Sequence, residues 1–370
     1  MSSRILITGG AGFIGSHLAD ELLAAGYSVS VLDSLDPQVH ETGERPAYLD
    51  DEVELIEGDV RDADLTGRLV RGADAVVHLA AAVGVGQSMY QLHRYVDVNA
   101  LGTATLLEAV ARHPVEKLVV ASSMSVYGEG AYHDASGQLV HPPRRTSAQM
   151  SRREWDLKGH DGEPLIPVPT PEQVTPLPTS PYALTKYDQE LLTLMTGSAY
   201  DVPAIAMRLF NVYGPRQALS NPYTGVMAIF ACRLLNGNPP LIYEDGEQLR
   251  DFVNVHDVAR AFRLALENRD VADTVFNIGS GSAVSIREIA TGIGEVLGHD
   301  DVEPQIVGKY RVGDVRHCFA DISAATALGY RPQVTLEDGL LELAGWLEGQ
   351  AAVDRVGQAS DELNRRGLAV

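Results

Sequence analysis

The first half of the chain alternates short apolar runs with helical stretches. The run Arg4–Thr8 (RILIT) precedes a helix expected from about residue 12 to residue 25. Apolar runs bounded by turn residues predict buried strands, and their alternation with helices predicts parallel βαβ units with right-handed crossovers. Further strands are expected at 28–33, 53–57, 75–79, 117–121 and 203–209. The chain is therefore predicted to be an α/β protein with a doubly wound parallel sheet.

Beyond about residue 215 the pattern loosens. A helix is expected near 225–235, followed by two strand candidates around Tyr243 and Phe252. The dipeptide Asp245-Gly246 between them is typical of a hairpin turn. The pattern predicts a second, smaller α/β domain with a different organisation.

A glycine-rich turn, residues 8–16 (TGGAGFIGS), separates the first strand from the first helix. Glycines here permit a tight turn and close approach of the backbone to a pyrophosphate, and the helix N-terminus attracts phosphate. Asp33 ends the second strand, where a carboxylate can accept hydrogen bonds from ribose hydroxyls. No arginine is near Asp33 in sequence and Asp36 adds negative charge, so NAD is favoured over NADP; the alternative is an ordinary turn aspartate. The turn residues expected to bind this cofactor are Gly9, Gly12, Phe13, Ile14 and Gly15.

Two further segments complete a catalytic pattern. Residues 121–128 (ASSMSVYG) end a strand, and 180–186 (SPYALTK) begin a helix that places Tyr182 and Lys186 on one face. There the ammonium group can lower the pKa of the phenol and make Tyr182 a usable base. Alone, such a pair is more often an ordinary surface pair, although this chain has only four lysines. Together with the glycine turn, these segments resemble the extended short-chain dehydrogenase/reductase superfamily, in its NAD-dependent nucleotide-sugar epimerase/dehydratase branch.

The resemblance implies a Rossmann-type sheet and assigns roles to individual residues. Ser123 would orient the reacting sugar hydroxyl, and Ser125 would be a second substrate contact. Tyr182 would be the acid/base, and Lys186 would hold the nicotinamide ribose and lower the pKa of Tyr182. The remaining cofactor contacts implied are Asp59 and Val60 beside the adenine, Leu79, Ala80 and Ala81 under the cofactor, and Asn99.

Substrate contacts follow from the same resemblance. Residues 208–215 (RLFNVYGP) match a family segment whose asparagine, here Asn211, contacts the sugar diphosphate. Arg250 and Arg311 match the arginines that clamp the two phosphates, a task that suits a planar guanidinium. The remaining candidates are Arg316 for phosphate, and Tyr243 and the helix at 225–231 for the base and ribose.

The chain is divided into three parts. Residues 1–187 are predicted to be the NAD-binding domain, with the strand at 203–209 joining its sheet, and 188–350 the nucleotide-sugar domain. The tail, 351–370, is expected to form a short amphipathic helix or to fray. Within the first part, 129–181 is long, polar and proline-rich, and loops of this length are usually functional or disordered. We favour a lid or wall over the site; the alternative is a flexible surface insertion.

Composition limits the partners and the compartment. The net charge of −21 argues against nucleic acid and anionic membranes as partners. Cys232 and Cys318 are isolated, which speaks against a disulfide scaffold or metal site and favours a reducing, cytoplasmic compartment. No secretion signal is expected at the N-terminus, and no apolar run reaches membrane-spanning length.

One position discriminates among the reactions of the family. Its 4,6-dehydratases carry Asp-Glu, and its UDP-glucuronate decarboxylases a Glu, where this chain has Met124-Ser125. With no carboxylate there, elimination of water lacks its extra acid and base, which favours an epimerase. The chain is most similar to dTDP-L-rhamnose 4-epimerase-like and UDP-glucose 4-epimerase-like proteins. Several of these have a cysteine pair in the long loop, but residues 155–162 (WDLKGHDG) have none, which leaves the sugar open.

The resulting prediction is a nucleotide-sugar 4-epimerase with tightly bound NAD. The Tyr182 phenolate would take the C4-hydroxyl proton while hydride passes to NAD, and hydride would return to the opposite face of a rotated 4-keto sugar. The alternatives are a reductase or dehydratase on the same fold, or a non-catalytic NAD-binding sensor, which need not retain the base. A homodimer is expected, because leucines on the helix after Asn99 and on the Tyr182 helix leave an apolar stripe for a two-fold seam.

Overall fold

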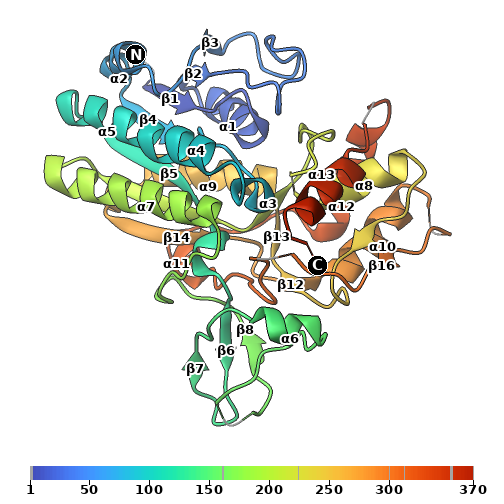
Figure 1. Cartoon of the computed structure of the whole chain (residues 1–370). Helices are drawn as coiled ribbons and strands as arrows, with labels where there is room; N and C mark the ends of the chain where they lie inside the picture. The colour runs from blue at the N-terminus through green and yellow to red at the C-terminus, as the bar shows by residue number, and fades with distance from the viewer. Residues whose placement is uncertain are drawn as a thin grey trace.

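A seven-stranded, fully parallel sheet forms the centre of the molecule, in the order β3-β2-β1-β4-β5-β9-β14 (Figure 1). The computed structural model describes residues 3–160, 162–223, 225–299, 301–311, 313–350 and 353–369. The strand order reverses between β1 and β4, which creates the crevice at which such sheets bind ligands. The predicted doubly wound, Rossmann-type sheet is confirmed. Its strands are β1 (Arg4–Thr8), β2 (Ser28–Asp33), β3 (Glu54–Glu57), β4 (Ala75–His78), β5 (Lys117–Ser123), β9 (Ala204–Leu209) and β14 (Thr274–Ile278).

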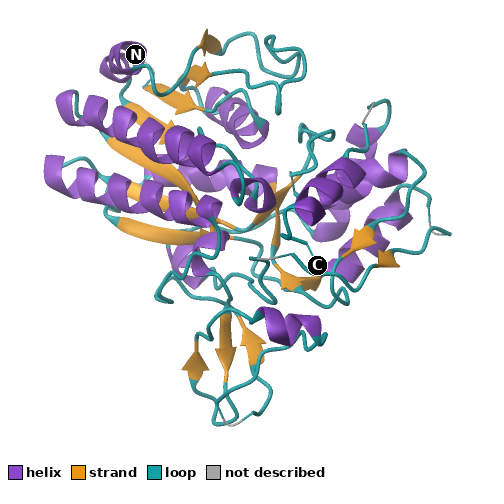
Figure 2. Cartoon of the chain, in the orientation of Figure 1, coloured by secondary structure: helices purple, strands orange, loops and turns teal. Residues whose placement is uncertain are grey.

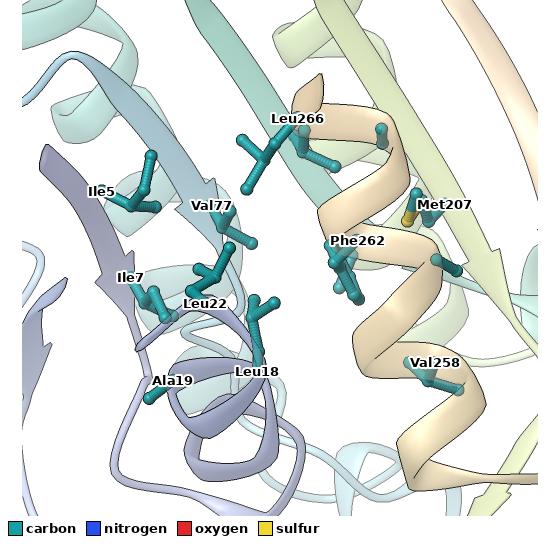
Figure 3. Packing of buried hydrophobic residues seen from close by; sticks show 14 of the residues in the cluster. Ile5, Ile7, Leu18, Ala19, Leu22, Val77, Met207, Val258, Phe262 and Leu266 are labelled. Atoms are coloured by element: carbon teal, nitrogen blue, oxygen red, sulfur yellow. The ribbon is translucent and has the colours of Figure 1, made fainter. Parts of the chain in front are cut away.

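Alternate side chains of each strand enter different hydrophobic layers, as the two-residue period of a strand requires. Ile5 and Ile7 of β1 face α1 (Phe13–Ala24) and α9 (Val255–Glu267), which pack side by side on one face (Figure 3). Leu6, between them, faces the opposite layer. The helices of that layer are α2 (Ala63–Gly72), α5 (Gly102–Arg112) and α7 (Pro181–Tyr200). Both faces of the sheet are therefore covered, and ligands can reach it only at its ends.

The crevice side of the sheet carries several short elements. α3 (Val85–Ser88) and α4 (Leu92–Tyr95) follow β4, and a π-helical turn, Val96–Leu101, leads into α5. A 3-10 turn, Met124–Tyr127, follows β5, and α11 (Ser323–Ala327) packs near β14.

A second lobe is built mainly from helices (Figure 2). α8 (Val226–Leu235), α10 (Ile286–Val296) and α12 (Leu336–Leu347) pack around a separate apolar cluster that includes Phe230 and Ile293. Its short strand pairs are β10 (Asn211–Tyr213) with β13 (Phe252–Asn254), β11 (Leu241–Ile242) with β16 (Gln305–Ile306), and β12 (Leu249–Arg250) with β15 (Val284–Ser285). The lobe also holds α13 (Val356–Arg365), from the predicted tail; residues 351, 352 and 370 of that tail lie outside the described residues.

The predicted hairpin through Asp245-Gly246 is wrong. The strands on either side of this turn pair with other strands, β11 with β16 and β12 with β15. The physical reason lies in the turn itself: the backbone N–H of Glu244 donates to the carbonyl of Lys309 at 2.7 Å, and the Asp245 carboxylate binds Arg316 at 2.6 and 2.9 Å. These distant partners draw the two flanks apart, so that they do not pair with each other.

Most of the predicted loop, from β6 to β8, forms a small lobe at the bottom of Figure 1. Its antiparallel sheet has the order β7-β6-β8, and Arg145 ties the lobe to Glu244 through two hydrogen bonds of 2.8 and 2.7 Å. Burial of this ion pair explains why the polar segment is ordered here. Its elements are β6 (Ala131–His133), β7 (Leu139–Val140), α6 (Ser147–Ser151) and β8 (Ile166–Val168).

Among the described residues, no helix is both long and apolar enough to cross a bilayer. The two cysteines, Cys232 and Cys318, are buried thiols with no disulfide between them.

Candidate active site

A cavity of about 450 Å³ opens at the carboxyl ends of the central strands. Its wall includes the glycine turn after β1, the end of β2, the segment after β4, the end of β5 and the first turns of α7. No described residue of 129–181 contributes to it, so the prediction that this segment is a lid or wall over the site is wrong for this cavity. The segment instead packs through Arg145 on the second lobe, and Glu172 packs on β14 by accepting from the N–H of Asn277 at 2.8 Å.

The glycine turn has the shape of a phosphate cradle. Gly9 has a φ of +71°, and a Cβ added to it would lie 2.7 Å from the backbone nitrogen of Ala80. A Cβ on Gly15 would lie 2.5 Å from Cα of Gly10. Only glycine fits these positions, so the turn can fold tightly at the start of α1, where a helix N-terminus attracts phosphate. The residues that were predicted to bind the cofactor and that line the cavity are Gly9, Gly12, Phe13, Ile14, Gly15, Asp33, Asp59, Val60, Leu79, Ala80 and Ala81.

Asp33 is fixed at the end of β2 by two backbone donors. The N–H of Ala11 donates to its Oδ2 at 3.0 Å and the N–H of Leu35 to its Oδ1 at 2.9 Å. Sequence reasoning missed Arg94, which lines the same cavity and donates to Asp36 Oδ2 at 2.7 Å. No signal in the sequence linked the two, because α4 brings Arg94 to Asp36 only in the fold. The positive charge of Arg94 is matched by Asp36, so Asp33 lines the cavity without an arginine partner.

Asn99 does not line the cavity, contrary to its predicted role as a cofactor contact. Its Oδ1 accepts from the N–H of Ala82 at 2.7 Å, and its Nδ2 donates to the carbonyl of Ala82 at 3.1 Å and to Thr185 Oγ1 at 3.0 Å. These bonds occupy both ends of the side-chain amide. Asn99 therefore fixes the segment after β4 against α7, one layer behind the wall.

Ser123, Tyr182 and Lys186 meet at the wall of the cavity, as predicted. Ser123 ends β5, where its hydroxyl accepts from the hydroxyl of Ser125 at 2.9 Å and is hydrogen-bonded to Tyr182. Ser180 caps α7 by accepting from the N–H of Ala183 at 3.1 Å, which sets Tyr182 in the first helical turn. Ser125 itself does not line the cavity. The strand end and the helix start thus deliver the three side chains to one place.

The electrostatics of this trio differ from the sequence prediction. Burial raises the pKa of Tyr182, and the hydrogen bond with Ser123 opposes that rise. Burial lowers the pKa of Lys186 to about 7, against a smaller raising effect of the Glu190 charge. The predicted lowering of the Tyr182 pKa is therefore not observed, because desolvation penalises the charged forms of both groups. Sequence reasoning also missed Tyr95, whose buried ring meets that of Tyr182 edge-on, with centroids 6.3 Å apart.

Of the predicted substrate contacts, Ser123, Asn211 and residues 225–227 line the cavity, and the buried Oδ1 of Asn211 has no hydrogen-bond partner. The guanidinium of Arg250 donates to the carbonyls of Leu249, Val315 and Arg316 at 2.6–3.0 Å. Arg316 is buried among Asp156, Glu244 and Asp245, so its predicted phosphate contact is wrong. The structure explains its position by this cluster of carboxylates, which lie 71 or more residues away from Arg316 in the sequence.

Arg311 and Tyr243 lie together outside the cavity. The guanidinium of Arg311 stacks 4.8 Å above the Tyr243 ring and donates to Asp314 Oδ2 at 2.8 Å. The segment that carries α13 covers them: the Tyr243 hydroxyl lies 3.1 Å from Ser360 Oγ, and Arg311 pairs through its backbone with Ala369.

Comparison with known proteins places the chain in a family. The model of the NAD dependent epimerase/dehydratase family matches residues 5–149 and 159–279. The chain belongs to this family. It is 40% identical over 349 residues to dTDP-L-rhamnose 4-epimerase of Burkholderia thailandensis, an alignment that covers 93% of this chain and 94% of the relative. The predicted family and fold class are thus confirmed, with NAD as its cofactor.

Solved structures of family members agree. UDP-glucose 4-epimerase of Thermotoga maritima, in complex with UDP-glucose, has a TM-score of 0.76 at 32% identity and covers 93% of this chain and 98% of its own. UDP-glucose 4-epimerase of Thermus thermophilus, in complex with NAD, has a TM-score of 0.73 at 32% identity and covers 94% of this chain and 100% of its own.

Proposed function

We propose that this family member is an NAD-dependent nucleotide-sugar 4-epimerase. The observation that carries the proposal is the meeting of Ser123, Tyr182 and Lys186 in a cavity that also contains the glycine cradle and Asp33. A binding module or sensor has no need for an acid/base pair beside a hydroxyl. The sequence similarity to sugar-nucleotide 4-epimerases along nearly the whole chain points the same way.

The residues present fit NAD. The turn from Gly9 to Gly15 would hold the pyrophosphate, because it lines the cavity where α1 begins. Asp33 would accept from the adenosine ribose, since two backbone N–H groups already turn its carboxylate to the cavity. NAD, when bound, supplies a reversible acceptor for the hydrogen at C4 of the sugar.

The chain itself supplies the proton chemistry. Tyr182 takes the proton of the C4 hydroxyl and returns it, and Ser123, which lines the cavity with Tyr182, orients the same oxygen. Lys186 contacts the nicotinamide ribose and, in its protonated form, stabilises the phenolate of Tyr182. These roles assign one task to each side chain of the trio.

The distribution of carboxylates favours epimerisation over elimination. Among the described residues that line the cavity, the carboxylates are Asp33, Asp36 and Asp59, all at the ends of the first strands. None lies beside Tyr182, and the residues after Ser123 are Met124 and Ser125. A dehydratase would need an acid and a base near the sugar. A reductase remains the second candidate, because it would use the same trio.

For the substrate we propose a nucleoside diphosphate hexose, with dTDP-L-rhamnose first among the candidates. The unpaired Oδ1 of Asn211 would accept from a sugar hydroxyl, and Arg311, whose side chain is 41% exposed, would contact phosphate. Arg250 and Tyr243 would contribute at the phosphate and base after their present contacts rearrange, and Ser125 would act through Ser123.

We further propose a cytoplasmic homodimer. The seam would run along α5, the preceding π-helical turn and α7, which lie side by side in Figure 1. Apolar side chains exposed there support it: Val96, Leu101, Leu184 and Met195 are each more than half exposed, whereas Leu106, Leu107 and Val110 belong to the core. The buried cysteine thiols fit a reducing compartment.

The substrate assignment is tested by incubating the purified protein with dTDP-L-rhamnose, UDP-glucose and UDP-N-acetylglucosamine and separating the products. Conversion of one of them to its C4 epimer, without added NADH, supports the proposal. Release of a 4-keto-6-deoxy sugar, or a requirement for stoichiometric NADH, would replace it with a dehydratase or a reductase.

A further inference from the structure

A fully buried polar cluster lies directly behind Lys186. It joins Gln189 of α7, His78 of β4, Thr103 of α5 and Thr8 of β1, and none of these four side chains lines the cavity. Lys186 is the one member of the cluster that does. Buried polar groups of this kind require hydrogen-bond partners, and the pattern of donors and acceptors therefore fixes their orientation.

The ammonium group of Lys186 determines how the Gln189 amide is turned. Nζ of Lys186 donates to Oε1 of Gln189 at 2.7 Å. An ammonium group has donors only, so the carbonyl oxygen of the amide must face it. The amide nitrogen then points the other way, to Oγ1 of Thr103 at 2.8 Å and to Nε2 of His78 at 3.0 Å.

Thr103 fixes this orientation from the far side of the amide. Its hydroxyl donates to the carbonyl of Asn99, so Oγ1 of Thr103 can only accept from the Gln189 amide nitrogen. Burial, together with the nearby Lys186 charge, lowers the pKa of His78 to about 3, so the ring is neutral. Nε2 of His78 lies 2.8 Å from Oγ1 of Thr103 and 3.0 Å from the amide nitrogen, and its Nδ1 lies 2.7 Å from Oγ1 of Thr8.

The protonation of Lys186 depends on its hydrogen bond to the Gln189 amide. On its own helix, Tyr182 is neutral at neutral pH, and the Glu190 carboxylate is already bound to Arg208 and Ser122. From the elements packed against α7, His78 and Tyr95 face this region, and neither carries a charge at neutral pH. Oε1 of Gln189 is the acceptor that the structure gives to the ammonium group.

We propose that Gln189 and Thr103 are positioning residues for Lys186, which hold its ammonium group protonated at the cavity wall. Gln189 supplies the acceptor, and Thr103, whose own proton is donated to Asn99, prevents the Gln189 amide from turning over. The catalytic importance of this device rests on the function proposed above, in which Lys186 serves the cofactor. The hydrogen-bond chain itself does not depend on which reaction the protein performs.

The chain has only four lysines, so the charge of Lys186 can be measured directly in the protein without ligand. The protein is labelled with 13C at lysine Cε and titrated by NMR, and the Lys186 signal is assigned by its loss in Lys186→Arg. Gln189→Leu should lower the Lys186 pKa from about 7 by one unit or more, because the acceptor is lost. Gln189→Glu, which keeps the shape of the side chain, should raise it by a similar amount and preserve the folded protein if Gln189→Leu does not.

Two controls separate this effect from general disturbance of the core. Thr193→Val alters a buried side chain further along the same helix, whose hydroxyl has no hydrogen-bond partner, and should leave Lys186 unchanged. Lys117 is also buried but donates to carbonyls of Asn268 and Val271, so its signal should not move in any variant. An unchanged Lys186 pKa in both Gln189 variants would overturn the proposal.

The role of Thr103 has its own readout. Thr103→Val, which keeps the shape of the side chain, should lower the Lys186 pKa, since the Gln189 amide loses its acceptor. An unshifted Lys186 pKa in Thr103→Val would show that Thr103 does not hold the amide. This result is independent of turnover and therefore of the epimerase assignment.

Discussion

The pKa values of Tyr182 and Lys186 depend on the residues packed around them as well as on their motif. Both line the cavity, and burial shifts the pKa of each toward its neutral form. The sequence predicts their spacing on α7 because a helix repeats every 3.6 residues. It does not predict the direction of the pKa shifts, since these depend on strands and helices that pack around the pair. The side chains behind Lys186 include Gln189 and His78, which lie more than a hundred residues apart along the chain.

Tyr182→Phe should abolish nearly all turnover while leaving NAD binding largely intact. The phenol hydroxyl is the group that moves the proton, a contribution on the order of a hundredfold or more. The ring itself remains to pack edge-on against Tyr95. Turnover within a few-fold of the unaltered protein, at equal NAD affinity measured by fluorescence titration, would contradict the proposed acid/base.

Asp33→Ala should weaken NAD binding by about tenfold or more and relax discrimination against NADP. The carboxylate is held by the N–H groups of Ala11 and Leu35, and a hydrogen bond to a charged group contributes about 1.5–3 kcal/mol. Asp36→Ala is the matched control, because Asp36 lines the same cavity but is paired with Arg94. Calorimetric titration measures the NAD affinity of both variants. Equal losses of affinity would show that Asp33 has no special role.

At the scale of elements, local sequence signals predicted correctly those helices and strands whose bounds are set by their own residues. Ser180 and Pro181 mark the start of α7, and the apolar runs mark the central strands. The Asp245-Gly246 turn misled because its flanks are held by Lys309 and Arg316, which are remote in sequence. The ordered lobe within 129–181 was missed for the same reason, since its anchor is the buried pair of Arg145 and Glu244.

Ser180→Ala should cost about 1 kcal/mol of unfolding free energy through loss of the helix cap. It should also reduce turnover, because the cap sets the first turn of α7 in which Tyr182 lies. Thr335→Ala removes the equivalent cap of α12, in the other lobe, where Thr335 accepts from the N–H of Asp338. This control should lose stability in urea denaturation but keep its turnover per folded molecule. A parallel loss of turnover in both would mean that the effect is general.

At the scale of the whole molecule, the sheet order places the glycine turn, Asp33 and Ser123 at one edge. That arrangement follows from parallel βαβ connectivity and was predictable. The position of α13 on Tyr243 and Arg311 was not, since its contacts cross from the last described segment to the middle of the second lobe. The predicted substrate arginines therefore lie outside the cavity although their motifs match the family.

The exposed apolar positions on α5 and α7 predict the assembly. Light scattering at micromolar concentration should give twice the 39.8 kDa of one chain. Leu184→Glu should shift the protein toward monomer, because the side chain is 51% exposed on α7. Leu341→Glu, at a comparably exposed leucine of α12, should leave the mass unchanged. A monomer for the unaltered protein would show that this stripe is not a seam.

The most direct test of the central claim follows the hydrogen at C4 of the sugar. The protein is incubated with a nucleotide sugar that carries deuterium at C4, and both reactant and product are examined by NMR. An epimerase removes this hydrogen and returns it to the same carbon, so we predict deuterium at C4 of both epimers and no accumulation of NADH. Deuterium at C6 of a 4-keto-6-deoxy sugar, or conversion that consumes reduced cofactor, would contradict the account.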